Sequence, residues 1–78
     1  MTDPADDKPT GVTWVHAFAE ALGVEPPDES EIEELLALAG TAAHASERLA
    51  APLACWLVGR AGRTPAEAHE VARALRVG

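Results

Sequence analysis

The sequence predicts an all-α fold, a compact bundle of four short helices preceded by a disordered N-terminal tail. Apolar side chains recur at helical spacing, and capping residues, prolines and glycines mark where helices start and end. The one apolar run that suits a strand has no partner strand in the sequence. With 78 residues, the chain has room for one small domain, which we place at residues 13–78.

Residues 1–12 are expected to form a flexible acidic tail. This segment contains Pro4, Pro9 and Gly11 and almost no large apolar side chain. It therefore buries too little surface to offset the entropy lost on ordering.

The first predicted helix has Thr13 as its N-cap. Its large side chains recur every fourth residue and share one stripe, namely Trp14, Phe18 and Leu22. Gly23 suits the left-handed position after a helix, and Val24 folds back against the last turn. Pro26 and Pro27 prevent the helix from continuing.

The second predicted helix begins with Asp28 or Ser30, because each is followed three residues later by a glutamate, as in a capping box. It runs to about Ser46. The apolar face consists of Ile32, Leu35, Leu36 and Ala39. Gly40 either leaves a shallow strip for close helix packing or kinks the helix.

The third predicted helix carries Pro52 in its first turn and ends between Gly59 and Gly62. It is apolar nearly all round, through Leu53, Cys55, Trp56, Leu57 and Val58. This pattern is typical of a central, buried helix. The flanking alanines and the proline favour a helix over a strand.

The fourth predicted helix has the clearest start in the chain. Thr64 and Glu67 form a capping box, with Pro65 at the first helical position. The predicted buried stripe consists of Ala68, Val71, Ala72 and Leu75.

The composition predicts a core of small side chains. Hydrophobic residues make up 47% of the chain, but 17 residues are alanine, and the only aromatic residues are Trp14, Phe18 and Trp56. Such a core contributes little burial energy, so a homodimer or partner interface is expected to complete it.

The same composition excludes several classes of protein. No apolar run is long enough to span a bilayer, and acidic rather than basic residues follow Met1. Cys55 is the only cysteine, which excludes an internal disulfide. We therefore expect a cytoplasmic protein without membrane contact.

The net charge of -7 is divided unevenly along the chain. Residues 1–47 hold 11 acids and Lys8, a charge of -10, whereas residues 48–78 hold five arginines and two glutamates, a charge of +3. One lysine and an acidic balance argue against nucleic-acid binding. The arginines are expected to pair with the acidic half or, alternatively, to form a local anion site.

The candidate site residues are His44, Glu47 and Arg48, whose spacing places them on adjacent turns of one helix. In one interpretation Arg48 binds an anion and His44 changes protonation near neutral pH. In the other, all three residues stabilise a helix end: Arg48 offsets the helix dipole, Glu47 pairs with it, and His44 bonds a loop carbonyl.

Other polar residues indicate a functional site less strongly. Arg60 and Arg63 could form an anion-binding corner with the start of the fourth helix, or compensate a helix dipole. Cys55 lies among apolar residues, which favours core packing and a raised pKa. The histidines lie on three different helices, so no local zinc motif exists. We expect no metal, no cofactor and no enzymatic activity.

One segment resembles a known family. Residues 42–53, with Trp14 and residues 19–24 before them, resemble a small uncharacterised bacterial domain associated with molybdopterin-guanine dinucleotide biosynthesis proteins, over roughly residues 13–62. The matching positions are His44, Arg48, Ala51, Pro52 and Leu53. Leu49 stands where proline is common. The resemblance implies association with a guanylyltransferase rather than catalysis, because this chain has no glycine-rich nucleotide loop.

These observations lead to three hypotheses of function. The first is a non-catalytic accessory or interaction module linked to molybdenum-cofactor guanylylation or molybdoenzyme maturation. Its protein partner would bind an apolar groove beside the third helix, rimmed by His44, Arg48 and the later arginines. The second is an anion- or nucleotide-binding domain using Arg48, Arg60 or Arg63. The third is a structural homodimerisation domain.

Overall fold

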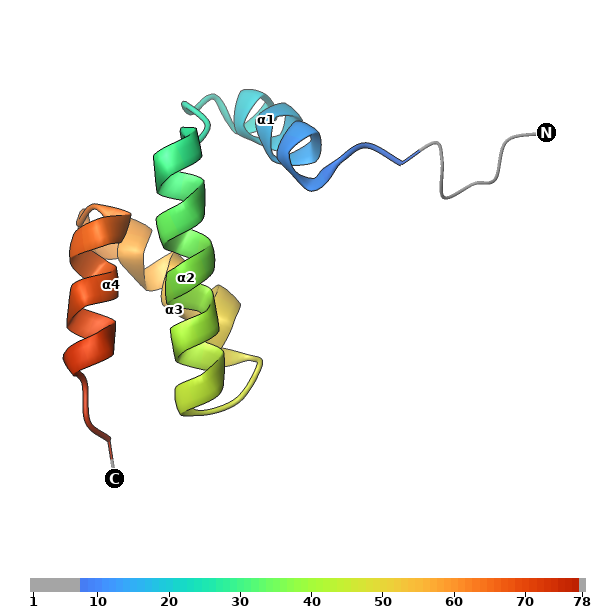
Figure 1. The fold of residues 1–78 in the computed structure, drawn as a ribbon. Coiled ribbons are helices and arrows are strands. Elements are labelled where there is room, and N and C mark those ends of the chain that lie inside the picture. Colours follow the sequence, from blue (N-terminus) through green and yellow to red (C-terminus); the bar gives the residue numbers. More distant parts are fainter. Residues whose placement is uncertain (1–7, 78) are drawn as a thin grey trace.

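The computed structural model describes residues 8–77 and contains four helices (Figure 1). They are α1 (Gly11–Leu22), α2 (Glu29–Ala45), α3 (Ala50–Ala61) and α4 (Pro65–Ala74). The described residues contain no strand, which confirms the all-α prediction. None of the helices in this part of the chain is long and apolar enough to cross a membrane.

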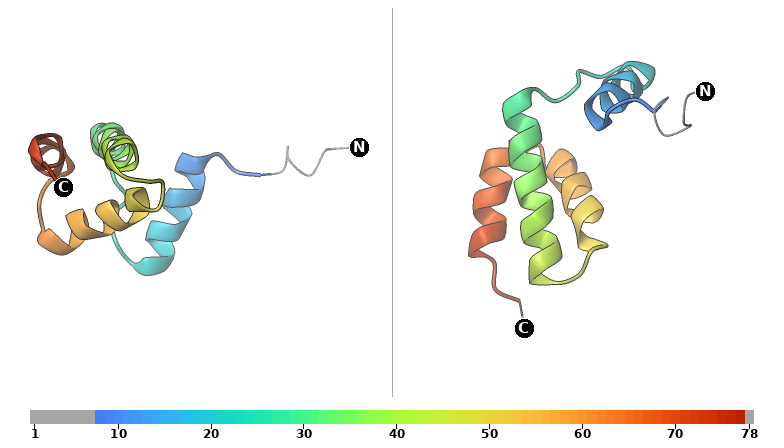
Figure 2. Two further views of the ribbon diagram at one scale, coloured as in Figure 1. Left: turned by 90° about the horizontal axis from the view of Figure 1, so that it is seen from below. Right: turned by 45° about the vertical axis from the view of Figure 1, so that its right-hand side comes forward.

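The central helix is α2, which packs against both α3 and α4 (Figures 1 and 2). The helix α1 lies to one side, beyond the connection that leads into the start of α2. It packs on none of the other helices as extensively as α3 and α4 pack on α2. The prediction that the third helix is the central one is therefore wrong.

Three hydrophobic residues among those described are buried, namely Ala19, Leu38 and Val58, and none of them is larger than leucine. On α3, only the face with Ala51, Cys55 and Val58 is covered, whereas Trp56 and Leu57 are more than half exposed. The expectation that α3 is buried nearly all round is wrong, because a helix at the edge of the molecule has one partner.

The buried stripe of α4 also differs from the prediction. Ala68 and Ala72 are half-buried as expected, but Val71 and Leu75 are exposed, and Leu75 lies beyond the last helical residue. His69 takes part in the packed face instead. The face of α4 that packs on α2 thus consists of alanines and His69, and the larger apolar residues lie on the outer side.

The start of α1 lies earlier than predicted. The N-cap is Thr10, whose hydroxyl accepts a hydrogen bond of 3.1 Å from the backbone N–H of Thr13. Gly11 and Val12, placed in the predicted 1–12 tail, thus form the first turn of the helix. Residues 1–7 of that tail lie outside the described residues.

The end of α1 confirms the predicted stop. Gly23 adopts a φ of 77°, in the left-handed region that favours glycine. Its N–H donates to the carbonyl of Glu20, and the N–H of Val24 donates to the carbonyl of Ala19, both at 3.0 Å. These two bonds are the Schellman arrangement that ends many helices.

Capping boxes start α2 and α4. At α2 the cap is Asp28 rather than Ser30, and its carboxylate accepts from the Glu31 N–H at 2.8 Å. At α4 the predicted box of Thr64 and Glu67 is confirmed, with Pro65 at the first position. The helix α2 ends at Ala45, within one residue of the prediction.

Gly40 lies inside α2 with open space around it. A Cβ built at this position meets no other atom within 4 Å. The expectation that Gly40 permits close packing by another helix is therefore wrong. A glycine here also makes the unfolded chain more flexible than an alanine would.

We expect Gly40→Ala to raise the free energy of unfolding by about 0.5–1 kcal/mol, because alanine favours a helix interior over glycine. Urea denaturation followed by circular dichroism measures the change. The matched control is Gly62→Ala, which should lower stability because Gly62 has a φ of 70°. A loss of stability in Gly40→Ala would contradict the open space described here.

The Glu67 carboxylate makes the stability of α4 depend on pH. Its pKa lies below the ordinary value of 4.5, because the carboxylate accepts hydrogen bonds from the backbone and side chain of Thr64, with a smaller effect of Arg63. A depressed pKa in the folded state stabilises the fold above the unfolded pKa. This stabilisation is lost as the pH falls through the folded pKa.

When the pH is lowered from 7 to below 4.5, we therefore expect the Glu67→Gln protein to lose less stability than the native chain does. Glutamine keeps an oxygen that accepts from Thr64 but does not titrate. Thermal unfolding at both pH values measures the difference, with Glu20→Gln at an exposed position as the control. Equal acid sensitivity in Glu67→Gln and the native chain would contradict this assignment.

Candidate functional site

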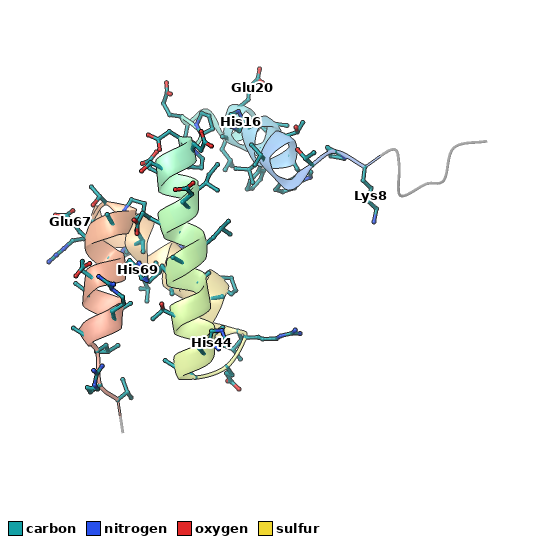
Figure 3. All side chains as sticks on the ribbon, in the orientation of Figure 1. Lys8, His16, Glu20, His44, Glu67 and His69 are labelled. Atoms are coloured by element: carbon teal, nitrogen blue, oxygen red, sulfur yellow. The ribbon has the colours of Figure 1, made fainter. Side chains whose placement is uncertain are left out.

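A polar cluster joins α2 and α4 through three side chains. The Nδ1 atom of His69 lies 3.3 Å from Oε2 of Glu34, and its Nε2 atom lies 3.1 Å from Oγ1 of Thr41. The His69 side chain is 16% exposed and that of Glu34 is 41% exposed. His69 is the labelled residue between the two helices in Figure 3.

Helix geometry explains why these residues meet. Glu34 and Thr41 are seven residues apart, two turns on one face of α2. His69 follows Ala68 on the packed face of α4 and reaches between them. A carboxylate only accepts, so Nδ1 donates to Glu34; in the neutral ring, Nε2 then accepts from the Thr41 hydroxyl.

The order hydroxyl, imidazole, carboxylate is also that of a nucleophilic triad. Such chemistry needs a substrate pocket and hydrogen-bond donors for an oxyanion. Thr41 lies inside α2, where the backbone N–H groups bond within the helix, and neither groove described below includes Thr41 or His69. We therefore interpret the cluster as a link that fixes α4 against α2.

The sequence pattern indicated His69 only as one of three scattered histidines and did not predict this cluster. The available signal was the position of His69 beside Ala68 on the predicted buried stripe. A histidine there needs polar partners, and Glu34 and Thr41 share the face of α2 that a neighbouring helix contacts.

The structure does not place His44, Glu47 and Arg48 on adjacent helical turns. His44 is exposed in the last turn of α2, and the helix ends at Ala45 (Figure 3). Glu47 and Arg48 lie in the following turn, where their carbonyls accept from the N–H groups of residues 50 and 51 at 3.0 and 3.1 Å. All three side chains are exposed, and the described ion pairs do not include them.

The remaining arginines do not converge either. The guanidinium of Arg60 lies over the ring of Trp56, 5.5 Å from its centre, which is a cation–π arrangement. Arg63 follows α3 and helps to lower the pKa of Glu67. Arg48 and Arg60 lie at opposite ends of α3, so one compact anion site does not include both.

The predicted pairing of the arginines with the acidic half of the chain is not formed between the described residues. The arginine ion pair present there joins Arg73 to Glu70 within α4. The acidic half contributes Glu34 to a pair with His69.

Cys55 and the histidines have different surroundings. Cys55 is half-buried on the side of α3 that faces α2, and burial raises the pKa of its thiol, which confirms the prediction. His16, His44 and His69 lie on three helices. Within residues 8–77, no group of three or more His, Cys, Asp or Glu side chains could hold a metal ion.

Two helices present apolar faces that no other helix of residues 8–77 covers. We call the first the α3 outer face; it consists of Leu53, Trp56, Leu57 and Arg60. On α1, the rings of Trp14 and Phe18 lie 5.0 Å apart and both side chains are about half exposed. Large exposed apolar patches typically mark interaction surfaces.

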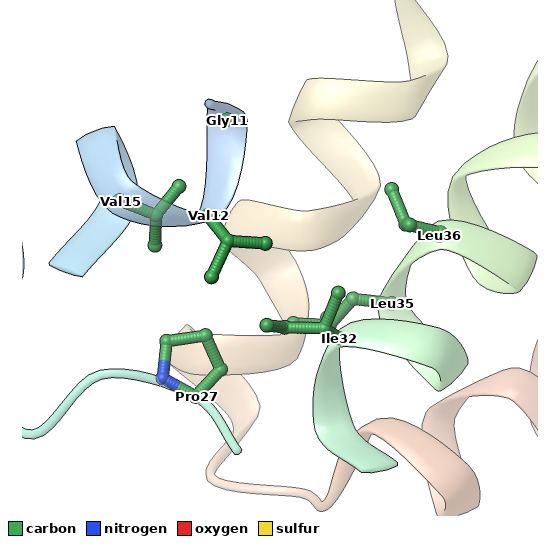
Figure 4. A pocket seen from close by; sticks show the side chains of 7 residues that line it. All are labelled: Gly11, Val12, Val15, Pro27, Ile32, Leu35 and Leu36. Atoms are coloured by element: carbon green, nitrogen blue, oxygen red, sulfur yellow. The ribbon is translucent and has the colours of Figure 1, made fainter. Parts of the chain in front are cut away.

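A groove of about 360 Å³ lies between α1 and α2 (Figure 4). We call it the α1–α2 groove; beside Gly11, its lining is Val12, Val15, Pro27, Ile32, Leu35 and Leu36. A second hollow of about 540 Å³ shares part of this lining and adds His16 and three acids, Asp28, Glu29 and Glu33. The groove thus has an apolar floor and an acidic rim.

Comparison with known proteins identifies a family but no characterised relative. The family described as a domain of unknown function, DUF6457, matches residues 6–77. No curated protein and no solved structure matches the chain.

We expect Thr41→Val to lower the free energy of unfolding by about 0.5–1.5 kcal/mol, because it removes the hydrogen bond to His69 at nearly constant shape. Thr41→Ser keeps the hydroxyl and should be closer to the native chain. Urea denaturation of the three proteins tests this. A Thr41→Val protein as stable as the native one would exclude a role for the cluster in joining α2 to α4.

Proposed function

Since the chain belongs to DUF6457, a family of domains of unknown function, we propose that it is a non-catalytic helical module that binds a protein partner through the α3 outer face. The observation that carries this proposal is the exposure of Trp56, which is 61% exposed in a chain with few large side chains. A cytoplasmic location fits the use of a single cysteine.

The α3 outer face has the composition of an interface centre. Leu53, Trp56 and Leu57 recur at helical spacing and are each more than half exposed. Tryptophan and arginine are the residues most enriched among those that dominate binding energy. The Arg60 guanidinium already lies over Trp56, so this pair needs little rearrangement to meet a partner.

Charge indicates the chemistry of the partner. Arg48 precedes α3, Arg60 lies in its last turn and Arg63 follows it, whereas α3 contains no acidic residue. An apolar surface bordered by carboxylates would complement this arrangement. The resemblance of residues 42–53, which include Arg48 and Leu53, supports a guanylyltransferase of molybdenum-cofactor synthesis or a molybdoenzyme-maturation protein as that partner.

We expect Trp56→Ala to weaken binding to such a purified partner at least tenfold, because truncation removes the largest side chain of the face. Arg48→Ala should weaken binding while leaving the thermal transition almost unchanged. Titration calorimetry measures both affinities.

The matched control is Trp14→Ala, which removes the same side chain, at 55% exposure, from α1. It should bind as the native chain does. Equal loss in both tryptophan variants would exclude the α3 outer face as the binding surface. Failure of the native chain to bind either class of partner would reject the molybdenum link.

A further inference from the structure

The α1–α2 groove selects an occupant with apolar side chains and positive charge. Its lining is uncharged, and the adjoining hollow adds His16 and the three acids Asp28, Glu29 and Glu33. Residues 25–34 hold six acids and no base. A segment with apolar side chains next to cations would cover the floor and neutralise the rim.

The chain itself contains such a segment at the end of α4. Val71, Leu75 and Val77 are 56%, 62% and 86% exposed, and Arg73 and Arg76 lie between them. We call residues 71–77 the basic segment. It complements the groove in both hydrophobicity and charge.

The basic segment does not reach the groove of its own chain. The groove lies beside the first turns of α2, whereas α4 runs toward the other end of α2 (Figures 1 and 2). Since α2 has 17 residues, these ends are roughly 25 Å apart. Occupation within one chain would require α4 to leave α2 and break the His69 cluster.

The exposed area is large enough for a stable dimer. The chain exposes 6383 Å², whereas a compact protein of 8.1 kDa exposes about 4,500 Å². A standard interface buries about 800 Å² on each partner.

We propose that the occupant of the groove is the basic segment of a second copy of this chain. Groove and segment lie at opposite ends of α2, so two copies placed antiparallel bring each basic segment to the other's groove. A two-fold axis then relates two identical contacts and closes the assembly. This surface is distinct from the α3 outer face.

Charge reversal on each side of the contact tests the proposal. One variant carries Arg73→Glu and Arg76→Glu, and the other carries Glu29→Lys and Glu33→Lys. Each alone should raise the dissociation constant of the dimer at least tenfold, measured by sedimentation equilibrium. An equimolar mixture of the two should form dimers again, because both contacts of the mixed pair then join opposite charges.

Several results would overturn the proposal. One is a native chain that is still a monomer at several hundred micromolar. Another is a dimer that persists in both charge-reversal variants. A third is a mixture of the two variants that stays monomeric although each variant has a native thermal transition. A molecular mass that increases beyond that of a dimer as the concentration rises would show open-ended association of copies instead of a closed dimer. Trp56→Ala should leave the dissociation constant of the dimer unchanged. A failure of the dimer proposal can therefore be told apart from a failure of the α3 outer face as the partner-binding surface.

Discussion

The packing of α2 against two neighbours through small side chains determines the rest of the structure. Leu38 is the one residue of α2 that is buried, at 3% exposure, and the facing helices contribute residues such as Ala51, Val58 and Ala72. Small side chains allow helices to approach closely but bury little apolar area. The larger residues therefore lie on outer surfaces, where a partner can cover them.

The polar link through His69 has particular value in such a thin core. Hydrophobic contact is non-directional, so alanine-rich faces define the position of α4 along α2 only weakly. Hydrogen bonds of His69 with Glu34 and Thr41, two turns apart, define both the position of α4 along α2 and the rotation of α4 about its own axis. The cluster thus supplies the specificity that large interlocking side chains supply in other bundles.

Local signals allowed the helices to be predicted from the sequence, whereas their contacts were not predictable. Asp28, Gly23 and the Thr64 box act within a few residues, so their effect is visible in the chain itself. Which face of α3 is covered depends on where α2 lies. The apolar pattern of this helix predicted burial for Cys55 and Trp56 alike. The predicted His44–Arg48 site assumed a continuing helix, but α2 ends at Ala45. The His69 cluster joins residues 28 and 35 positions apart, beyond the reach of any local pattern.

Because α1 is separate from the other helices, the chain consists of two units that differ in their stability against local unfolding. An isolated helix of 12 residues is marginal in water, and α1 gains little from packing on α3 or α4. Its backbone N–H groups should open to exchange with solvent at a free energy below that of α2, without disturbing the α2–α4 contacts. Any ligand that contacts α1 must then supply the ordering entropy of that helix, which lowers affinity while leaving selectivity intact.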